Sequence, residues 1–384
     1  MNIGLVRGRS GEHYTGRMAS QAFVLPVLFQ QRLQGNVKKV EMTLMNNQKT
    51  TINDVARLAG VSKRTVSRVI NNSAKVGKVT RAKIQKIIAD LNYSPNAQAR
   101  GLAARRSYLL GMIYDNPDAL YLDDVQRGVL SICREFGYEL VVHPCDMKAD
   151  SLINEAVGFA NRSKLDGVII LPPISENNDL AGALGKAGVN YVRLASIALD
   201  SADHVVISNE RSAAAAMAEY LVELGHTRIG YIAGPKGMKS TRERLEGFCE
   251  ALEKHGCKPA KEMLARGAYT FESGIECTRT LLANPVPPTA IFASNDEMAV
   301  GVINAAQDMG LNVPGDLSVA GFDDSILASR IMPSLTTIRR PVREMARLAT
   351  SKLIATIDGR HDDAHTGNIL VPALVTRNST RSIS

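Results

Sequence analysis

Residues 51–72 read TINDVARLAGVSKRTVSRVINN, and this stretch decides the fold of the N-terminal part of the chain. Thr51 is followed three residues later by Asp54, which is a capping pair for the start of a helix. From Ile52 to Ala59 the apolar residues recur at spacings of three and four, so they share one helical face. Gly60 follows, and a glycine at that place ends a helix. The pattern therefore predicts a short amphipathic helix over 52–59.

Two further helices are expected after the first. Ser62 can cap a second helix, in which Val66, Val69 and Ile70 share an apolar face. Thr80 is expected to cap a third. Two short helices joined by a glycine-containing turn, with a third as support, form a helix-turn-helix, and its second helix fits a DNA major groove. A small three-helix bundle with a solvated charged face is the alternative.

The polar side of the second helix carries donors that suit DNA. Arg64 or Arg68 fits a bidentate contact to guanine, and Lys63, Ser67 and Asn71 fit phosphates or base edges. The distribution of charge agrees with this. Residues 51–107 hold 12 Lys and Arg against 2 Asp and Glu, whereas 108–384 hold 27 against 34. A basic head attracts the phosphate backbone. A solvated basic face that binds no DNA would give the same distribution of charged residues.

The quoted stretch, followed by NYSPNAQARGLAARRS at 92–107, resembles the head and hinge of the lactose/galactose-repressor (LacI/GalR) family. The resemblance implies that Lys63 and Arg64 contact bases and that Arg68 adds a base or phosphate contact. It also implies that 96–103 folds only when two copies pair over a bent minor groove, where Leu102 wedges between base pairs. A plain linker is the alternative. The expected DNA-binding residues are Thr51, Ser62, Lys63, Arg64, Thr65, Ser67, Arg68, Asn71, Asn96, Ala99 and Leu102.

The rest of the chain predicts two lobes. Apolar runs alternate with amphipathic stretches over 108–384, which favours parallel sheets covered by helices on both faces. The expected fold is a small all-α head plus an α/β body of two doubly wound lobes of the periplasmic-binding-protein type. The expected strands are Leu109–Tyr114, Glu139–Val142, Gly167–Leu171, Tyr191–Leu194, Val205–Ile207, Arg228–Ala233, Arg266–Tyr269, Ala290–Ala293, Ser318–Gly321 and Leu370–Arg377.

The domain boundaries follow from these elements. We expect a disordered N-terminal extension over 1–50, because residues 1–41 show no clear period; a misassigned start codon is the alternative for 1–41. The apolar run in this extension is too short to span a membrane and fits a signal peptide poorly. The helix-turn-helix occupies 51–95 and the hinge 96–107. The body occupies 108–384, with lobe one at about 108–207 and 339–360 and lobe two at about 208–338 and 361–384.

Polar residues directly after strands are the candidates for a binding site, because ligands of parallel sheets bind at the carboxyl ends of the strands. Asn295, Asp296 and Asp323 directly follow expected strands, Tyr269 ends one, and Arg244 lies early in the helix after another. A carboxylate or guanidinium engages neighbouring hydroxyls, and an aromatic ring covers the apolar side of a sugar. The family resemblance places effector contacts at the same positions and adds Tyr121. For the aspartates, helix capping is the alternative; for Tyr121, core packing.

Several other functions find no support in the pattern. The five cysteines and seven histidines lack metal-site spacing, so we expect no metal and no cofactor. The loop GPKGMKS at 234–240 misses the spacing of a phosphate-binding loop, and no catalytic motif is found, so we expect no enzyme. Four cations hint at an acidic effector, with solvated surface as the alternative: Arg193, Lys236, Lys239 and Arg242.

Together the sequence predicts a cytoplasmic, nucleoid-associated transcription regulator of the repressing type. Its partners would be near-palindromic double-stranded operator DNA, a sugar-type effector between the lobes, and a second copy of the chain, as a dimer or a tetramer. No membrane partner is expected. The rival functions are a solute-binding receptor, a sugar-active enzyme with an appended DNA-binding head, and an architectural DNA binder with an empty cleft.

Overall fold

The computed structural model describes residues 50–70, 73, 75–93, 106–115, 118–360 and 367–383, which fall into two compact units that divide near residue 96. The first unit is the head. It contains α2 (Ile52–Ala59), α3 (Lys63–Ile70) and α4 (Lys78–Asp90), packed around a small apolar core. Within the described residues, no helix is both long and apolar enough to cross a membrane.

The ends of the head helices follow the predicted capping, with one exception. The carboxylate of Asp54 accepts hydrogen bonds from the backbone N–H of Thr51 (3.0 Å) and from its hydroxyl (2.8 Å). Gly60 adopts a left-handed conformation at φ 65° and ends α2. Helix α4, however, is capped by Gly77. The prediction that Thr80 caps this helix is wrong, because Thr80 already lies in its first turn.

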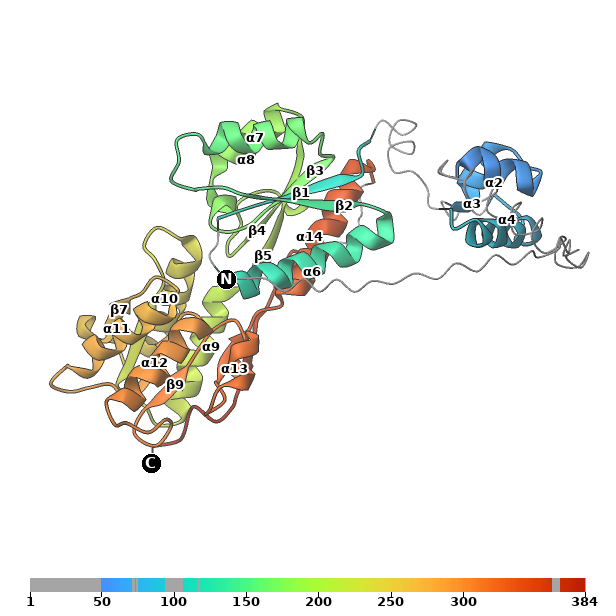
Figure 1. Cartoon of the computed structure of the whole chain (residues 1–384). Coiled ribbons are helices and arrows are strands. Elements are labelled where there is room, and N and C mark those ends of the chain that lie inside the picture. Colours follow the sequence, from blue (N-terminus) through green and yellow to red (C-terminus); the bar gives the residue numbers. More distant parts are fainter. Residues whose placement is uncertain are drawn as a thin grey trace, which may run out of the picture. The chain divides into compact units, whose positions relative to one another are not determined.

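The second unit is the body, and its first lobe is a six-stranded parallel sheet in the order β11-β5-β4-β3-β1-β2. Helices α6 and α14 cover one face and α7 and α8 the other (Figure 1). The strands are β1 (Leu109–Tyr114), β2 (Glu139–Pro144), β3 (Gly167–Ile170), β4 (Asn190–Ala195), β5 (Val205–Ser208) and β11 (Ile369–Leu370). The helices are α6 (Ala119–Phe136), α7 (Leu152–Arg162), α8 (Asn178–Lys186) and α14 (Val342–Ile357).

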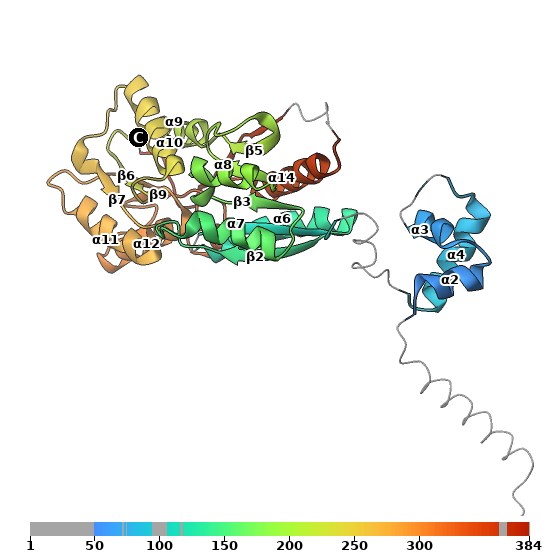
Figure 2. The same ribbon diagram turned by 90° about the horizontal axis from the view of Figure 1, so that it is seen from above.

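The second lobe is a four-stranded parallel sheet in the order β7-β6-β8-β9. Helices α9 and α10 pack on one face, and α11 and α12 pack on the other (Figure 2). Its strands are β6 (Ile229–Ala233), β7 (Leu264–Arg266), β8 (Ala290–Ala293) and β9 (Ser318–Ala320). Its helices are α9 (Glu210–Glu223), α10 (Lys239–Lys254), α11 (Phe271–Leu282), α12 (Asp296–Asp308) and α13 (Ile326–Arg330).

A two-stranded antiparallel ribbon of β10 (Thr337–Arg339) and β12 (Ala373–Val375) completes the second lobe. The chain therefore passes between the lobes three times, after β5, after β10 and after β11. Three short 3-10 turns complete the described elements: Ile174–Glu176, Ala202–His204 and Lys261–Met263.

The structure corrects three of the body predictions. The expected strand at Arg266–Tyr269 lies earlier, at Leu264–Arg266, because Tyr269 takes a left-handed φ of 65° that a strand excludes. The expected strand Leu370–Arg377 is split into β11 and β12 around Pro372. Since β11 pairs with β5, part of 361–384 lies in lobe one rather than in lobe two.

Candidate functional site

Helix α3 presents its first turn to solvent. Ser62 caps the helix, because its hydroxyl accepts the backbone N–H of Thr65 at 3.2 Å and lies 2.9 Å from the Thr65 hydroxyl. Lys63 and Arg64 are exposed directly behind this cap, and no acidic residue lies in the first turn. Cations at a helix N-terminus oppose the helix dipole. Lys63 and Arg64 therefore oppose folding slightly, but they form a concentrated positive surface that suits a phosphate backbone.

The other expected DNA-binding residues divide by position. Ser67 and Arg68 are half-buried along α3, while Val66 and Val69 on the opposite side are buried in the head core. Thr51 caps α2, and its hydrogen bond is the largest cause of a lowered pKa at Asp54. Four expected contacts lie outside the described residues and stay predictions: Asn71, Asn96, Ala99 and Leu102.

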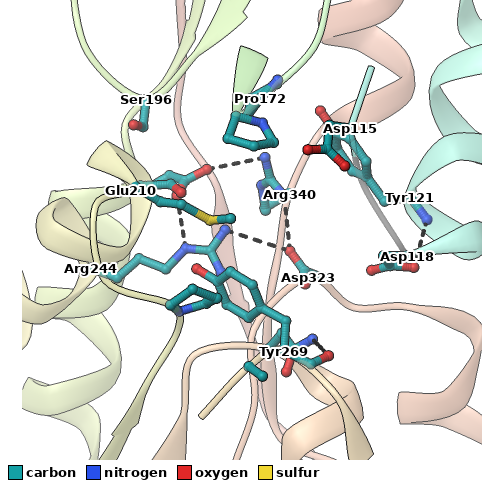
Figure 3. A pocket seen from close by; sticks show the side chains of 16 residues that line it. Asp115, Asp118, Tyr121, Pro172, Ser196, Glu210, Arg244, Tyr269, Asp323 and Arg340 are labelled. Carbon is teal, nitrogen blue, oxygen red and sulfur yellow. Dashed lines mark hydrogen bonds and ion pairs between the residues drawn. The ribbon is translucent and has the colours of Figure 1, made fainter. Parts of the chain in front are cut away.

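In the body, a cavity of about 180 Å³ lies between the two lobes (Figure 3). Residues of both lobes line it, at the carboxyl ends of the strands. Five of the six predicted effector residues lie there: Tyr121, Arg244, Tyr269, Asn295 and Asp323. The lining also includes polar residues that the sequence analysis did not select: Asp115, Asp118, Ser196, Glu210 and Arg340.

Two arginines and two acids form the centre of this cavity, and we call them the charge quartet: Glu210, Arg244, Asp323 and Arg340. Arg244 donates from Nε to Glu210 at 2.7 Å. Arg340 pairs with Glu210 at 3.1 Å and donates to Asp323 at 3.1 Å. Figure 3 shows both guanidinium groups between the two carboxylates.

The quartet connects segments that pass between the lobes. Glu210 begins α9 immediately after β5, and Arg340 follows β10 just before α14. Burial opposes the charged form of Glu210, but Arg244 and Arg340 outweigh it, so the pKa of Glu210 lies below its ordinary value. Burial raises the pKa of Asp323 despite the same two arginines. Glu210 therefore stays charged and holds both guanidinium groups in place.

Aromatic rings pack against the two arginines. The Arg244 guanidinium carbon lies 3.9 Å from the ring centre of Phe322, and that of Arg340 lies 5.3 Å from the ring centre of Tyr121. Burial raises the pKa of Tyr121 to about 12, so its hydroxyl stays protonated. Rings of this kind offer flat apolar faces beside charged hydrogen-bonding groups.

A hydrogen bond between Asn295 and Tyr269 holds both residues at the edge of the cavity. The Asn295 side chain caps α12 by accepting the backbone N–H of Met298 at 3.0 Å, and it donates to the Tyr269 carbonyl at 3.0 Å. The Tyr269 hydroxyl lies 2.9 Å from that of Thr241. Asn295 therefore lines the cavity, as predicted, and it also caps α12, a role that was expected only for the aspartates.

The loop that carries Asp323 has an unusual backbone. Asp323 and Asp324 have backbone φ values of 115° and 55°, which residues other than glycine rarely adopt. Asp324 is held by Arg339 and Arg377, each at 2.6 Å. These ion pairs secure the loop, and the Asp323 carboxylate then points toward the cavity (Figure 3).

Asp296 departs from the prediction, because its carboxylate is buried behind the cavity rather than in its lining. It accepts the Thr337 hydroxyl at 2.5 Å and the Ser325 backbone N–H at 2.6 Å. Burial, followed by the nearby Asp323, raises the pKa of Asp296 to about 8. Asp296 therefore supports the loop that carries Asp323.

The four cations that hinted at an acidic effector do not line the cavity. Arg193 is buried in lobe one, where it donates to the Ser175 carbonyl at 2.7 Å and to Asn178 at 2.8 Å. The other three line a separate groove on lobe two: Lys236, Lys239 and Arg242. These residues therefore give no support to an acidic ligand in the cavity.

Comparisons with known proteins agree with this architecture. Residues 51–96 match the model of bacterial regulatory proteins of the lacI family, and residues 218–380 match that of a periplasmic binding protein-like domain. The ribose operon repressor of Escherichia coli is 35% identical over 305 residues, which cover 79% of this chain and 92% of that protein. A probable HTH-type transcriptional repressor of Bacillus subtilis, ExuR, is also 35% identical, over 80% of this chain and 91% of its own length.

Solved structures show the same arrangement. The lac repressor dimer bound to operator and an anti-inducer matches with a TM-score of 0.70 and 30% identity, over 87% of this chain and 100% of that one. A complex of the regulator CelR with cellobiose matches with a TM-score of 0.64 and 28% identity, over 86% of this chain and 99% of that one. The chain belongs to the lacI family of bacterial regulatory proteins.

Proposed function

We propose that this protein represses transcription by binding operator DNA through α3, and that a small hydroxylated molecule between the lobes sets its affinity for DNA. The observation that carries the proposal is the charge quartet. Its members come from two interlobe segments and from lobe two, and they surround one cavity. A molecule that binds there contacts the segments on which the relative position of the lobes depends.

The charges of the cavity favour an uncharged polyol over a phosphorylated or acidic sugar. Four carboxylates line it, on Asp115, Asp118, Glu210 and Asp323, against the two guanidinium groups of Arg244 and Arg340. Each arginine already pairs with an acid. An anionic ligand would have to break these buried pairs, which is costly.

Unpartnered polar atoms support a ligand rich in hydroxyl groups. Within the described residues, the Ser196 hydroxyl and the Arg340 Nε are buried and have no hydrogen-bond partner. A buried polar group without a partner costs free energy, which a hydroxyl of the ligand would recover. The solved structure of the similar regulator CelR is a complex with cellobiose, an uncharged sugar.

Control of DNA binding follows from linkage. If the ligand binds one arrangement of the lobes more tightly than another, it shifts the population toward the first, and the DNA affinity changes by the same free energy. The operator is expected to be near-palindromic and the active form a homodimer, because each head contacts one half-site. The hinge over 96–107 stays part of this proposal, with Leu102 as the wedge.

The other proposed functions have less support. The two relatives compared by sequence above are named as a ribose operon repressor and a probable transcriptional repressor. A solute-binding receptor for transport does not bind DNA, so the exposed cations behind the cap of α3 would have no role in it. We therefore place the protein on DNA in the cytoplasm.

Ligand binding tests this proposal. Thermal unfolding of the full chain would be followed with neutral sugars and polyols, nucleosides, sugar acids and sugar phosphates. We expect a neutral polyol to raise the unfolding temperature of the wild type and of Asp316→Asn, whose carboxylate is exposed on the same lobe. Asp323→Asn should lose this response. A response to sugar phosphates alone, or one that Asp323→Asn retains, contradicts the proposed ligand class and site.

A further inference from the structure

Three potential metal ligands meet in lobe one, away from the charge quartet. His143 lies near the end of β2, Cys145 follows that strand, and Glu155 lies on α7. One side-chain donor atom from each lies within 4.8 Å of the other two. Figure 1 shows β2 and α7 in this lobe. The three donors are an imidazole nitrogen, a thiol sulfur and a carboxylate oxygen.

The surroundings hold these donors in place. The His143 ring stacks on Phe159, with 4.3 Å between ring centres and 12° between planes. The backbone N–H of Cys145 donates to the Tyr114 carbonyl at 2.8 Å. The His143 ring and the backbone at Cys145 therefore have defined positions before a ligand binds.

The His143 Nε2 atom has an unusual position. It lies 3.1 Å from the Glu155 carboxylate. At that distance it is nevertheless buried without a hydrogen-bond partner among the described residues, because the contact lacks hydrogen-bond geometry. A plain histidine–glutamate hydrogen bond, the simplest alternative, thus does not account for this nitrogen.

The local charge favours a cation. The carboxylates of Glu155 and Asp115 lie near the Cys145 thiol, so its surroundings are negative. Within the described part of the chain, no lysine or arginine forms an ion pair with Glu155. A divalent ion would supply the missing positive charge.

We propose that His143, Cys145 and Glu155 bind a divalent transition metal ion of the Zn²⁺ type, through Nε2, Sγ and a carboxylate oxygen. Zinc prefers this mixture of donors, and three protein ligands leave a fourth position for water. Tetrahedral bonds of about 2.0–2.3 Å place the ligand atoms roughly 3–4 Å apart, so a shift of about 1 Å completes the site. The ion displaces the thiol proton, which passes to solvent while the metal–sulfur bond forms.

Cobalt(II) and zinc test the site directly. The metal-free full chain, without an affinity tag that contains histidine, would be titrated with Co²⁺ and followed by absorption. We expect one ion per chain, a thiolate-to-cobalt charge-transfer band, and displacement of Co²⁺ by Zn²⁺. Cys145→Ser should lose the band, whereas Cys133→Ser, which removes another buried thiol of the same lobe, should keep it.

A second variant keeps the test valid if Cys145→Ser fails to fold. Glu155 is only partly buried, with 38% of its side chain accessible, so Glu155→Gln should fold normally. We expect Zn²⁺ affinity to fall at least about tenfold in this variant, and to stay unchanged in Glu135→Gln, an exposed control on α6. Absence of the charge-transfer band in the wild type, or equal affinity in both glutamine variants, overturns the proposal.

Discussion

Gly234 lies where a side chain would strike Tyr269. A Cβ atom at this position would approach the Tyr269 ring to 2.1 Å and its hydroxyl oxygen to 2.4 Å. These distances are far below contact, so the ring must move away from the cavity wall that it forms. The absence of a side chain at 234 thus determines where the tyrosine lies.

Gly234→Ala should therefore weaken ligand binding. We expect the dissociation constant of the effector to rise about tenfold or more, because the displaced ring no longer covers the ligand. Calorimetric titration measures this. Gly185→Ala is the control, since a Cβ there meets no atom within 4 Å. Unchanged affinity in Gly234→Ala would show that the ring takes no part in binding.

Asp296 predicts a pH dependence. Its folded-state pKa of about 8 lies above the ordinary value of 3.8. Between these values the folded chain keeps a proton that the unfolded chain loses, so stability falls as the pH rises from about 4 to about 8. In Asp296→Asn this contribution is absent, while the hydrogen-bonding shape is kept.

We expect Asp296→Asn to gain stability relative to the wild type as the pH rises from about 5 to about 8. Urea unfolding at several pH values measures the difference. A difference that is independent of pH, or one that grows toward low pH, would mean that Asp296 is charged in the folded protein.

At the scale of single residues, the sequence predicted half of the quartet. Asp323 comes just after a recognisable strand and Arg244 lies early in the helix after another, so the expectation of a site at the strand ends included both. Glu210 also follows a strand, β5, but it was not among the predicted site residues. Arg340 follows β10, a three-residue strand that no pattern indicated. Only the fold brings these two segments together.

At the scale of elements, α3 is the part whose surface chemistry is most directly testable. Arg64 is exposed in its first turn, behind the Ser62 cap. We expect Arg64→Ala to weaken operator binding by about 1–3 kcal/mol and to relax base preference at one position of each half-site. Fluorescence anisotropy at fixed salt measures this. Lys86→Ala, on exposed α4, is the control, and equal losses in both would assign Arg64 a purely electrostatic role.

Helices α11 and α12 approach closely through glycine. A Cβ at Gly301 would lie 2.3 Å from the Phe271 carbonyl oxygen, which is backbone and cannot turn away. Gly301→Ala should therefore lower the free energy of unfolding by about 1–3 kcal/mol. Gly182→Ala, within α8 and with free space around its Cβ, should not destabilise the protein. Chemical denaturation compares them, and equal stability of the two variants would contradict this packing.

Predictions of elements failed where the partner strand is distant in the sequence. The stretch from Leu370 to Arg377 was expected to form one strand. In the structure Pro372 separates two short strands, and they pair with β5 of lobe one and β10 of lobe two. Local patterns specify that such residues are extended, but they do not specify the sheet. Long helices, such as α6 and α14, have no such dependence.

At the scale of the whole molecule, the three crossings between the lobes are the important feature. Two of them carry members of the charge quartet, Glu210 and Arg340, directly beside the cavity. The alternation of strands and helices predicted two discontinuous lobes, which the structure has. It did not predict that buried ion pairs would connect the crossings.

Operator binding with and without the ligand tests the central claim most directly. Purified full-length protein would be titrated at moderate salt against near-palindromic duplexes selected from random DNA, and against unselected DNA. We predict a clear preference for a palindrome, and a change in that affinity of about 5–150-fold when a neutral polyol that stabilises the protein is added. No preference for any palindrome, or a preference that such a ligand leaves unchanged, would contradict the account.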